Sequence, residues 1–263
     1  MKLFIKAFFP LCLLIMGAAT ASSVFAQPYP SKPITLVNPF PPGGTADFVG
    51  RLVAQKLGET AGWKVIVDNK PGATGQIGAK FVASALPDGY TVLLGPSSTH
   101  ATGPAVFKNL PYDVLRDFMG VTMLGSTANV LAVHPAVPAN TVKDLIAYAK
   151  ANPGKLAYAS TGDGTGLHIT GEMFKDAAGI DLLHVPFKGS APAMLAVIGG
   201  DVQMVFENIS GAVPNIKGGR LRAIAVTSAK RDPVLPEVPT LLESGMPGFE
   251  TLLSWFSIFV PAA

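Results

Sequence analysis

The sequence predicts an α/β fold made of two successive units, and three observations carry this prediction. Short runs rich in aliphatic and β-branched residues alternate with longer amphipathic segments along most of the chain. Clusters rich in Gly and Pro separate these runs. The alternation breaks near residue 125 and then starts again near Asn129. Because strands that alternate with helices form mostly parallel sheets flanked by helices, we expect two such sheets.

The first unit has the order strand, helix, strand, helix, strand. Residues 34–40 form an apolar run that is typical of a buried strand. In residues 45–57 the apolar side chains recur at helical spacing, which predicts an amphipathic helix. Residues 65–67 and 90–94 read as the next strands, and residues 76–85 as a helix that ends before Pro87.

The second unit repeats this alternation without repeating the sequence. A capping box of Thr141 and Asp144 opens its first helix. We expect the chain to cross between the units near residues 125–129 and again after Thr227. The first domain is therefore assigned to residues 27–124 with a return segment 229–263, and the second to residues 125–228. The predicted elements of the second unit are strands at 130–133, 156–159, 182–185, 202–206 and 221–226, and helices at 141–151, 166–178 and 191–198.

The first 26 residues have the pattern of a secretory signal peptide. Lys2 and Lys6 precede an apolar run, and small residues lead to a cleavage position after Ala26. The run is shorter than the roughly 20 residues that span a bilayer, and it contains Cys12, the single cysteine. Since the segment holds two of the 20 basic residues and none of the 17 acidic ones, the rest carries a net charge of +1. We expect a periplasmic protein that lacks disulfides and does not bind nucleic acid.

Three loops at the carboxyl ends of predicted strands are candidate binding elements, because ligands of open α/β sheets bind there. Residues 39–47 place Gly43 and Gly44 between rigid prolines and a helix start, whose free N–H groups and partial positive charge suit an anion. A plain turn is the alternative for this loop. Residues 160–168 place three glycines and three hydroxyls before another helix, and residues 95–100 add further hydroxyls.

Motifs of nucleotide binding and of catalysis are missing from these loops. The residue three after Gly164 is Leu167 rather than Gly, and no Gly-Lys-Ser/Thr follows either glycine loop. The chain has no Gly-x-Ser-x-Gly elbow and no His-Glu-x-x-His pair. We therefore predict a non-enzyme without catalytic residues, metal or cofactor. His100 and His168 lie beside candidate loops, where a structural role and a ligand contact both stay open.

An ordered set of short motifs covers essentially the whole chain after residue 26. The set comprises YPxKPI at 29–34, PFPPGG at 39–44, NKPG at 69–72, PDGY at 87–90, LPYD at 110–113, YAS at 158–160, VPFKGSAP at 185–192, LRAIAVTS at 221–228 and VPT at 238–240. Each motif is weak alone, but the order is specific. With this set the chain closely resembles the Bug-type periplasmic substrate-binding receptors of tripartite tricarboxylate transporters.

The resemblance implies a hinged, two-domain periplasmic binding protein fold whose interdomain cleft captures a small carboxylate. That ligand would be a di- or tricarboxylate, an amino acid or an aromatic acid, and the membrane subunits of the transporter would be the protein partners of a monomeric receptor. The family usually has Asp before Asn208, where this chain has the longer Glu207. The ligand-binding residues implied are Pro42, Gly43, Gly44, Thr45, Ser97 and Ser98 on one side of the cleft, Ser160, Thr161, Gly164, Thr165 and His168 on the other, and Phe187, Lys188 and Glu207 around them.

Two further expectations concern the chain end and other functions. Members of the family continue past Ala263 with helices that pack on the first domain, and these helices are missing here, which we interpret as a truncated sequence. A sensor that reports ligand to a membrane kinase would use the same cleft, and a secreted hydrolase is a more distant alternative.

Overall fold

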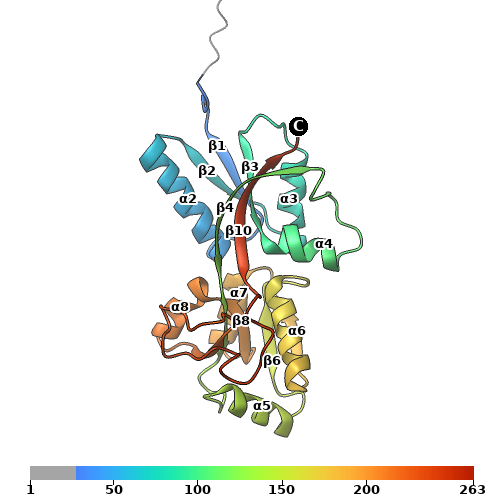
Figure 1. The fold of residues 1–263 in the computed structure, drawn as a ribbon, viewed down its shortest axis with the longest axis vertical. Helices are drawn as coiled ribbons and strands as arrows, with labels where there is room; N and C mark the ends of the chain where they lie inside the picture. The colour runs from blue at the N-terminus through green and yellow to red at the C-terminus, as the bar shows by residue number, and fades with distance from the viewer. Residues whose placement is uncertain (1–27) are drawn as a thin grey trace, which may run out of the picture. The chain divides into compact units, whose positions relative to one another are not determined.

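The computed structural model describes residues 28–263, and the predicted signal peptide lies outside the described residues. Residues Lys32–Ala263 form one compact unit that holds two five-stranded sheets, each with its own helices. We call each sheet with its helices a lobe (Figure 1). In the part of the chain that the structure describes, no helix combines the length and apolar character needed to cross a membrane.

The sheet of the first lobe has the strand order β2-β1-β3-β10-β4. Its first three members are parallel, whereas β10 runs antiparallel to both β3 and β4. A π-helical turn, Ser98–Thr102, follows β3 and leads into the short helix α4. The elements of this lobe are β1 (Ile34–Asn38), α2 (Thr45–Ala61), β2 (Val65–Asn69), α3 (Gln76–Ala83), β3 (Thr91–Pro96), α4 (Gly103–Val106), β4 (Phe118–Thr127) and β10 (Ser254–Pro261).

The sheet of the second lobe has the equivalent order β7-β6-β8-β5-β9. Here β7, β6 and β8 are parallel, and β5 runs antiparallel to β8 and β9. The elements are β5 (Asn129–Val133), α5 (Val142–Ala151), β6 (Ala157–Ser160), α6 (Gly166–Ala178), β7 (Leu183–Pro186), α7 (Ser190–Ile198), β8 (Met204–Asn208), α8 (Ile209–Lys217) and β9 (Arg222–Val226).

Helices cover both faces of each sheet, as the alternation of side chains along a strand requires. In the first lobe Leu36 packs with α2, while its neighbour Val37 packs with α3 on the opposite face. In the second lobe Leu131 packs with α5 and α6, and Val130 packs with α7 and α8. Figure 1 shows this arrangement, with α2 and α3 on either side of one sheet and α8 and α6 on either side of the other.

The predicted fold class is confirmed, and the predicted strands and helices all appear with small shifts at their ends. Two features were not expected. Half of the pairings in each sheet are antiparallel, and the ten-residue strand β4 had no sequence signal. The return segment also behaves differently from the prediction, because Leu235, Leu241 and Phe249 pack in the core of the second lobe before β10 rejoins the first. The division into two domains stays a prediction.

Two crossings connect the lobes, and Asn129 ties them together. The first is Ala128, between β4 and β5, and the second lies just before β10. The side chain of Asn129 donates to the carbonyl of Leu252 at 3.2 Å and accepts from the hydroxyl of Ser254 at 3.2 Å. Its backbone exchanges hydrogen bonds with Thr227. The two crossings are therefore held side by side.

Candidate functional site

A cavity of about 50 Å³ lies between the lobes, where the carboxyl ends of the parallel strands of both sheets meet. By the space one buried water needs, this volume holds roughly three to five water-sized groups. The described residues that line it are all uncharged: small residues, hydroxyl and amide side chains, and a few apolar ones. The cavity therefore suits a small polar molecule.

The start of α2 forms the wall from the first lobe. Gly44 is the N-cap residue in an extended conformation (φ −96°, ψ 177°), and Thr45 and Ala46 form the first helical turn. All three line the cavity. Because the first N–H groups of a helix have no partner within the helix, these amides are available as donors at its positive end.

Asp47 supports this wall from behind and does not line the cavity. Its carboxylate accepts hydrogen bonds from the Gly43 amide at 3.1 Å, from Arg51 at 2.9 Å and from Asn69 at 3.0 Å. Burial raises the pKa of Asp47, but these hydrogen bonds outweigh burial, and the pKa lies below its ordinary value. An ionised Asp47 thus fixes the loop before α2, and its negative charge is already satisfied by the groups that donate to it.

The start of α6 forms the facing wall. Thr165, the N-cap residue, lines the cavity together with Gly166 and Leu167 of the first turn. The hydroxyl of Thr165 donates to the carbonyl of Gly162 at 2.8 Å and accepts from the amide of His168 at 3.3 Å. The hydroxyl of Thr165 therefore donates to the loop and accepts from the helix. The backbone amides of Gly166 and Leu167 remain as donors to the cavity.

We expect Thr165→Ala to lower the free energy of unfolding by about 1–2 kcal/mol, because it removes the cap of α6 and the bond to Gly162. Urea unfolding followed by circular dichroism measures this change. Thr60→Ala is the control, since Thr60 is an exposed residue near the end of α2 whose hydroxyl bonds only to its own helix, and it should stay within about 0.5 kcal/mol. Equal unfolding free energies for both variants would contradict the capping role.

Two more helix starts and the turn after β3 complete the cavity. Ser190 is the first residue of α7, and Asn208 is the N-cap residue of α8. Ser97 and Ser98 come from the turn after β3. The carbonyl oxygen of the Asn208 side chain is buried without a hydrogen-bond partner among the described residues. The N-termini of α2, α6, α7 and α8 therefore converge on one small, uncharged space.

Glu207 lies behind Ser190 and is fully buried. Its Oε1 accepts hydrogen bonds from the Ser190 hydroxyl at 3.1 Å and from the Asn208 amide at 2.8 Å, whereas its Oε2 has no partner among the described residues. Burial raises the pKa of Glu207 to about 7, against the two hydrogen bonds, which lower it. Near neutral pH this carboxyl is therefore poised between its neutral and its charged form.

The structure brings six of the predicted site residues to the cavity and leaves the others around it. Pro42 and Gly43 are exposed in the loop before α2, where Gly43 has a positive φ of 86°. The residues that line the cavity are Gly44, Thr45, Ser97, Ser98, Thr161 and Thr165, and those that do not are Pro42, Gly43, Ser160, Gly164, His168, Phe187, Lys188 and Glu207.

Phe187 and Lys188 line a second, larger cavity of about 590 Å³ next to the first. It shares Phe40, Pro41 and Thr161 with the small cavity and extends along residues 71–75. Lys188 is exposed there. Phe187 and Lys188 thus line the adjoining larger cavity and not the small cavity at which the helix N-termini converge.

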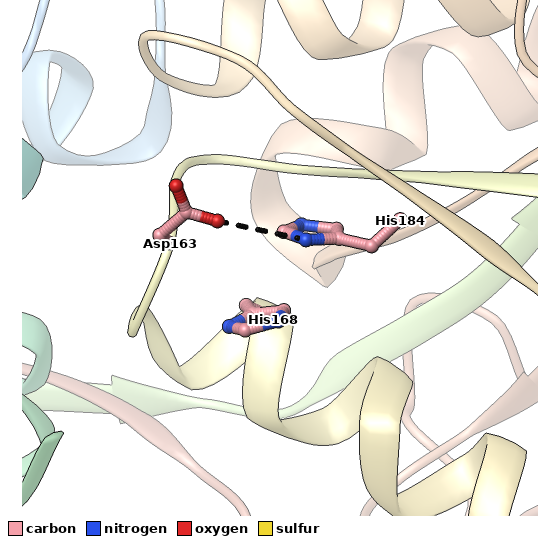
Figure 2. A group of neighbouring side chains, drawn as sticks. All are labelled: Asp163, His168 and His184. Carbon is pink, nitrogen blue, oxygen red and sulfur yellow. Dashed lines mark ion pairs between the residues drawn. The ribbon is translucent and has the colours of Figure 1, made fainter.

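Ser160, Asp163, His168 and His184 form a cluster beside the loop that opens α6. Figure 2 shows Asp163 pointing toward the ring of His184, which lies next to the ring of His168. The ring centroids of the two histidines are 4.0 Å apart with 18° between their planes. Ser160 Oγ lies 2.7 Å from Nε2 of His184, and Asp163 Oδ1 lies 3.6 Å from its Nδ1.

Neither a metal centre nor a catalytic triad fits this cluster. Ligand atoms of Asp163, His168 and His184 lie within 4.8 Å of one another. However, an imidazole binds a metal in the plane of its ring, so the stacked rings of the two histidines do not converge on one ion. In addition, Nδ1 of His168 accepts a hydrogen bond from the Gly164 amide and is therefore not free to bind a metal. The contact order Ser160, His184, Asp163 matches that of a catalytic triad. However, Ser160 is fully buried, so no substrate reaches its hydroxyl, and its Oγ also accepts a hydrogen bond from the Gly162 amide. The cluster stabilises the loop.

Several lining residues were missed by sequence reasoning. Ser190 follows strand β7 and Asn208 is the last residue of strand β8, so the same rule that selected the other loops applies to them. Ser254 and Phe256 come from β10, which enters the first sheet antiparallel from the far end of the chain, and no local signal marks them.

Comparison with known proteins identifies the family of this chain. Residues 49–263 match the model of the tripartite tricarboxylate transporter family receptor. Protein BugT of Bordetella pertussis is 38% identical over 250 residues, which cover 95% of this chain and 76% of BugT.

Solved structures agree with this match. The R. palustris protein Rpa4515, solved with adipate, is 38% identical with a TM-score of 0.87, covering 89% of this chain and 78% of that one. MatC from Rhodopseudomonas palustris, solved with bound malate, is 32% identical with a TM-score of 0.83, covering 89% of this chain and 79% of that one. From the matched family model and these similarities, the chain belongs to the tripartite tricarboxylate transporter receptor family.

Proposed function

We propose that this chain is a receptor that binds a small carboxylate in the cavity between its lobes. The observation that carries the proposal is the convergence of four helix N-termini on a space without charged lining residues. Free amides at a helix start donate hydrogen bonds, and the helix dipole favours a negative charge there. Such a cradle holds a carboxylate without an arginine.

The family and its solved members support a carboxylate as the ligand class. Rpa4515 was solved with adipate and MatC with malate. The cavity is small, and the adjoining space beside Phe187 and Lys188 offers room for the rest of a longer ligand. We propose a dicarboxylate or tricarboxylate, an amino acid or an aromatic acid, with one carboxylate on the amides of α2 and α6.

We further propose that the receptor works in the periplasm as a monomer and delivers its ligand to the membrane subunits of a tripartite transporter. In this proposal the two lobes move as domains about the two crossings, and closure brings both walls onto the ligand. The receptor catalyses no reaction. A sensor would use the same cavity but would bind a membrane kinase instead of the transporter subunits. A pull-down with the transporter subunits distinguishes the two roles.

Calorimetry with a panel of adipate, malate, citrate, aspartate and benzoate tests the proposed function. We expect at least one member to bind and to stabilise the chain, by about 2.7 kcal/mol when the free ligand is at 100 times its dissociation constant. The bound ligand should be recovered chemically unchanged. If no carboxylate of the panel binds, or if the ligand is converted to product, the proposed function is wrong.

A further inference from the structure

Glu207 is a buried titratable residue that a hydrogen bond connects to the wall of the small cavity. Ser190 lines the cavity, and its hydroxyl donates to Glu207 Oε1 at 3.1 Å. Glu207 itself lies outside the lining and is completely buried at the end of β8. Any effect of Glu207 on a ligand therefore passes through its hydrogen-bond partners Ser190 and Asn208, which line the cavity, or through its charge.

The carboxyl also lies near the start of α2 in the first lobe. The point that a Cβ atom on Gly211 would occupy is 2.8 Å from Thr45 Oγ1 and 3.6 Å from Glu207 Oε1. Thr45 Oγ1 and Glu207 Oε2 are both buried without hydrogen-bond partners among the described residues. An ionised Glu207 thus places a negative charge beside the same helix start on which a carboxylate would bind.

We propose that Glu207 is a positioning residue for the ligand and that the protein takes up a proton at Glu207 when it binds a carboxylate, an inference that rests on the proposed function. When Glu207 is ionised, the Ser190 proton is committed to Oε1, and Ser190 presents lone pairs to the cavity. A proton on Oε1 reverses this hydrogen bond, so that Glu207 donates to Ser190 and Ser190 donates to the ligand. Protonation also removes the repulsion between two buried negative charges.

The pKa of Glu207 is governed by its burial rather than by a neighbouring charge. The pKa of Glu207, raised to about 7, is set by burial and by the hydrogen bonds from Asn208 and Ser190, without a contribution from a charged side chain. Strand β5 and helix α7 carry no titratable side chain. The titratable and charged residues on the other elements around β8 are Asp47, Lys56, Arg51 and Glu59 of α2, Tyr158 of β6, His168, Glu172, Lys175 and Asp176 of α6, Lys217 of α8 and Arg222 of β9.

The expected pH dependence follows from linkage. Below pH 7 Glu207 is already neutral in the free protein, so the affinity is flat. Above pH 7 each binding event must first protonate Glu207, and the affinity falls by up to about tenfold per pH unit. The protein should take up about half a proton per ligand at pH 7 and close to one at pH 8.

Calorimetric titration of the carboxylate panel between pH 6 and 9, in buffers of different ionisation enthalpy, measures this uptake directly on the unsubstituted chain. Glu207→Gln, which mimics the neutral carboxyl, should bind about tenfold more tightly than the unsubstituted chain at pH 8 and should lose the proton uptake. Glu59→Gln, an exposed change on α2, is the matched control and should keep the original pH profile.

The outcomes separate the two proposals. Carboxylate binding without proton uptake, or a Glu207→Gln variant that binds more weakly at every pH, would overturn the role of Glu207 and leave the proposed function standing. A chain that binds no member of the panel would overturn the proposed function and this inference together.

Discussion

Replacing Gly44 by valine should weaken carboxylate binding by about a hundredfold, the largest loss of affinity expected for a single change. Gly44 has an extended backbone that any residue adopts, so the first lobe should fold normally. A Cβ atom there would lie 3.2 Å from Cβ of Ser190 on the other lobe. The two additional methyl groups would fill the small cavity and keep the start of α2 away from Ser190.

Calorimetry with the tightest member of the panel measures the loss, and urea unfolding checks that the variant is folded. Gly58→Ala is the control on the same helix, because a Cβ atom there meets only the Trp63 carbonyl at an ordinary 3.6 Å. We expect this control to bind normally. If Gly44→Val binds as tightly as the control, the ligand does not lie against the start of α2.

Replacing Gly171 by alanine should destabilise the chain by about 3 kcal/mol, although Ala is normally the better helix former. Gly171 lies on the buried face of α6, where a Cβ atom would overlap the ring of Tyr158. That ring cannot move away, because it is fully buried and its hydroxyl donates to Glu172 at 2.6 Å. The helix that carries one wall of the cavity would then be displaced from its sheet.

The free energy of unfolding in urea measures this effect, with Gly166→Ala as the matched control. Gly166 belongs to the same helix, and a Cβ atom there would meet nothing within 4 Å. The control should be neutral or slightly stabilising. A Gly171→Ala variant as stable as the control would show that the packing of α6 on Tyr158 is looser than described.

Local patterns in the sequence were sufficient to predict most of the fold. The helix predicted at 166–178 has the same bounds in the structure, where Thr165 caps its start and Gly179 ends it with a left-handed φ of 58°. The predicted capping box of Thr141 and Asp144 is also confirmed. Strand β4 escaped prediction because it is an edge strand whose side chains are mostly exposed, and alternation carries no signal there. The antiparallel insertion of β10 depends on long-range pairing.

The candidate site was predictable only where it follows from topology. Loops after parallel strands meet at one edge of a sheet, which is why the loops that hold Gly44, Ser97 and Thr165 could be chosen from sequence, whereas the individual residues were implied by the family resemblance. Which residues of a loop face inward depends on its backbone path, and Pro42 and Gly43 turn outward into solvent. Whether each of the predicted residues touches a ligand stays a prediction.

A crystal structure of the chain with its tightest-binding carboxylate tests the central claim most directly. We expect a carboxylate group of the ligand between the starts of α2 and α6, with its oxygens about 2.7–3.2 Å from the amides of Thr45 or Ala46 on one side and Gly166 or Leu167 on the other. A ligand whose carboxylate instead pairs with Lys188 in the adjoining cavity, away from these amides, would contradict the account.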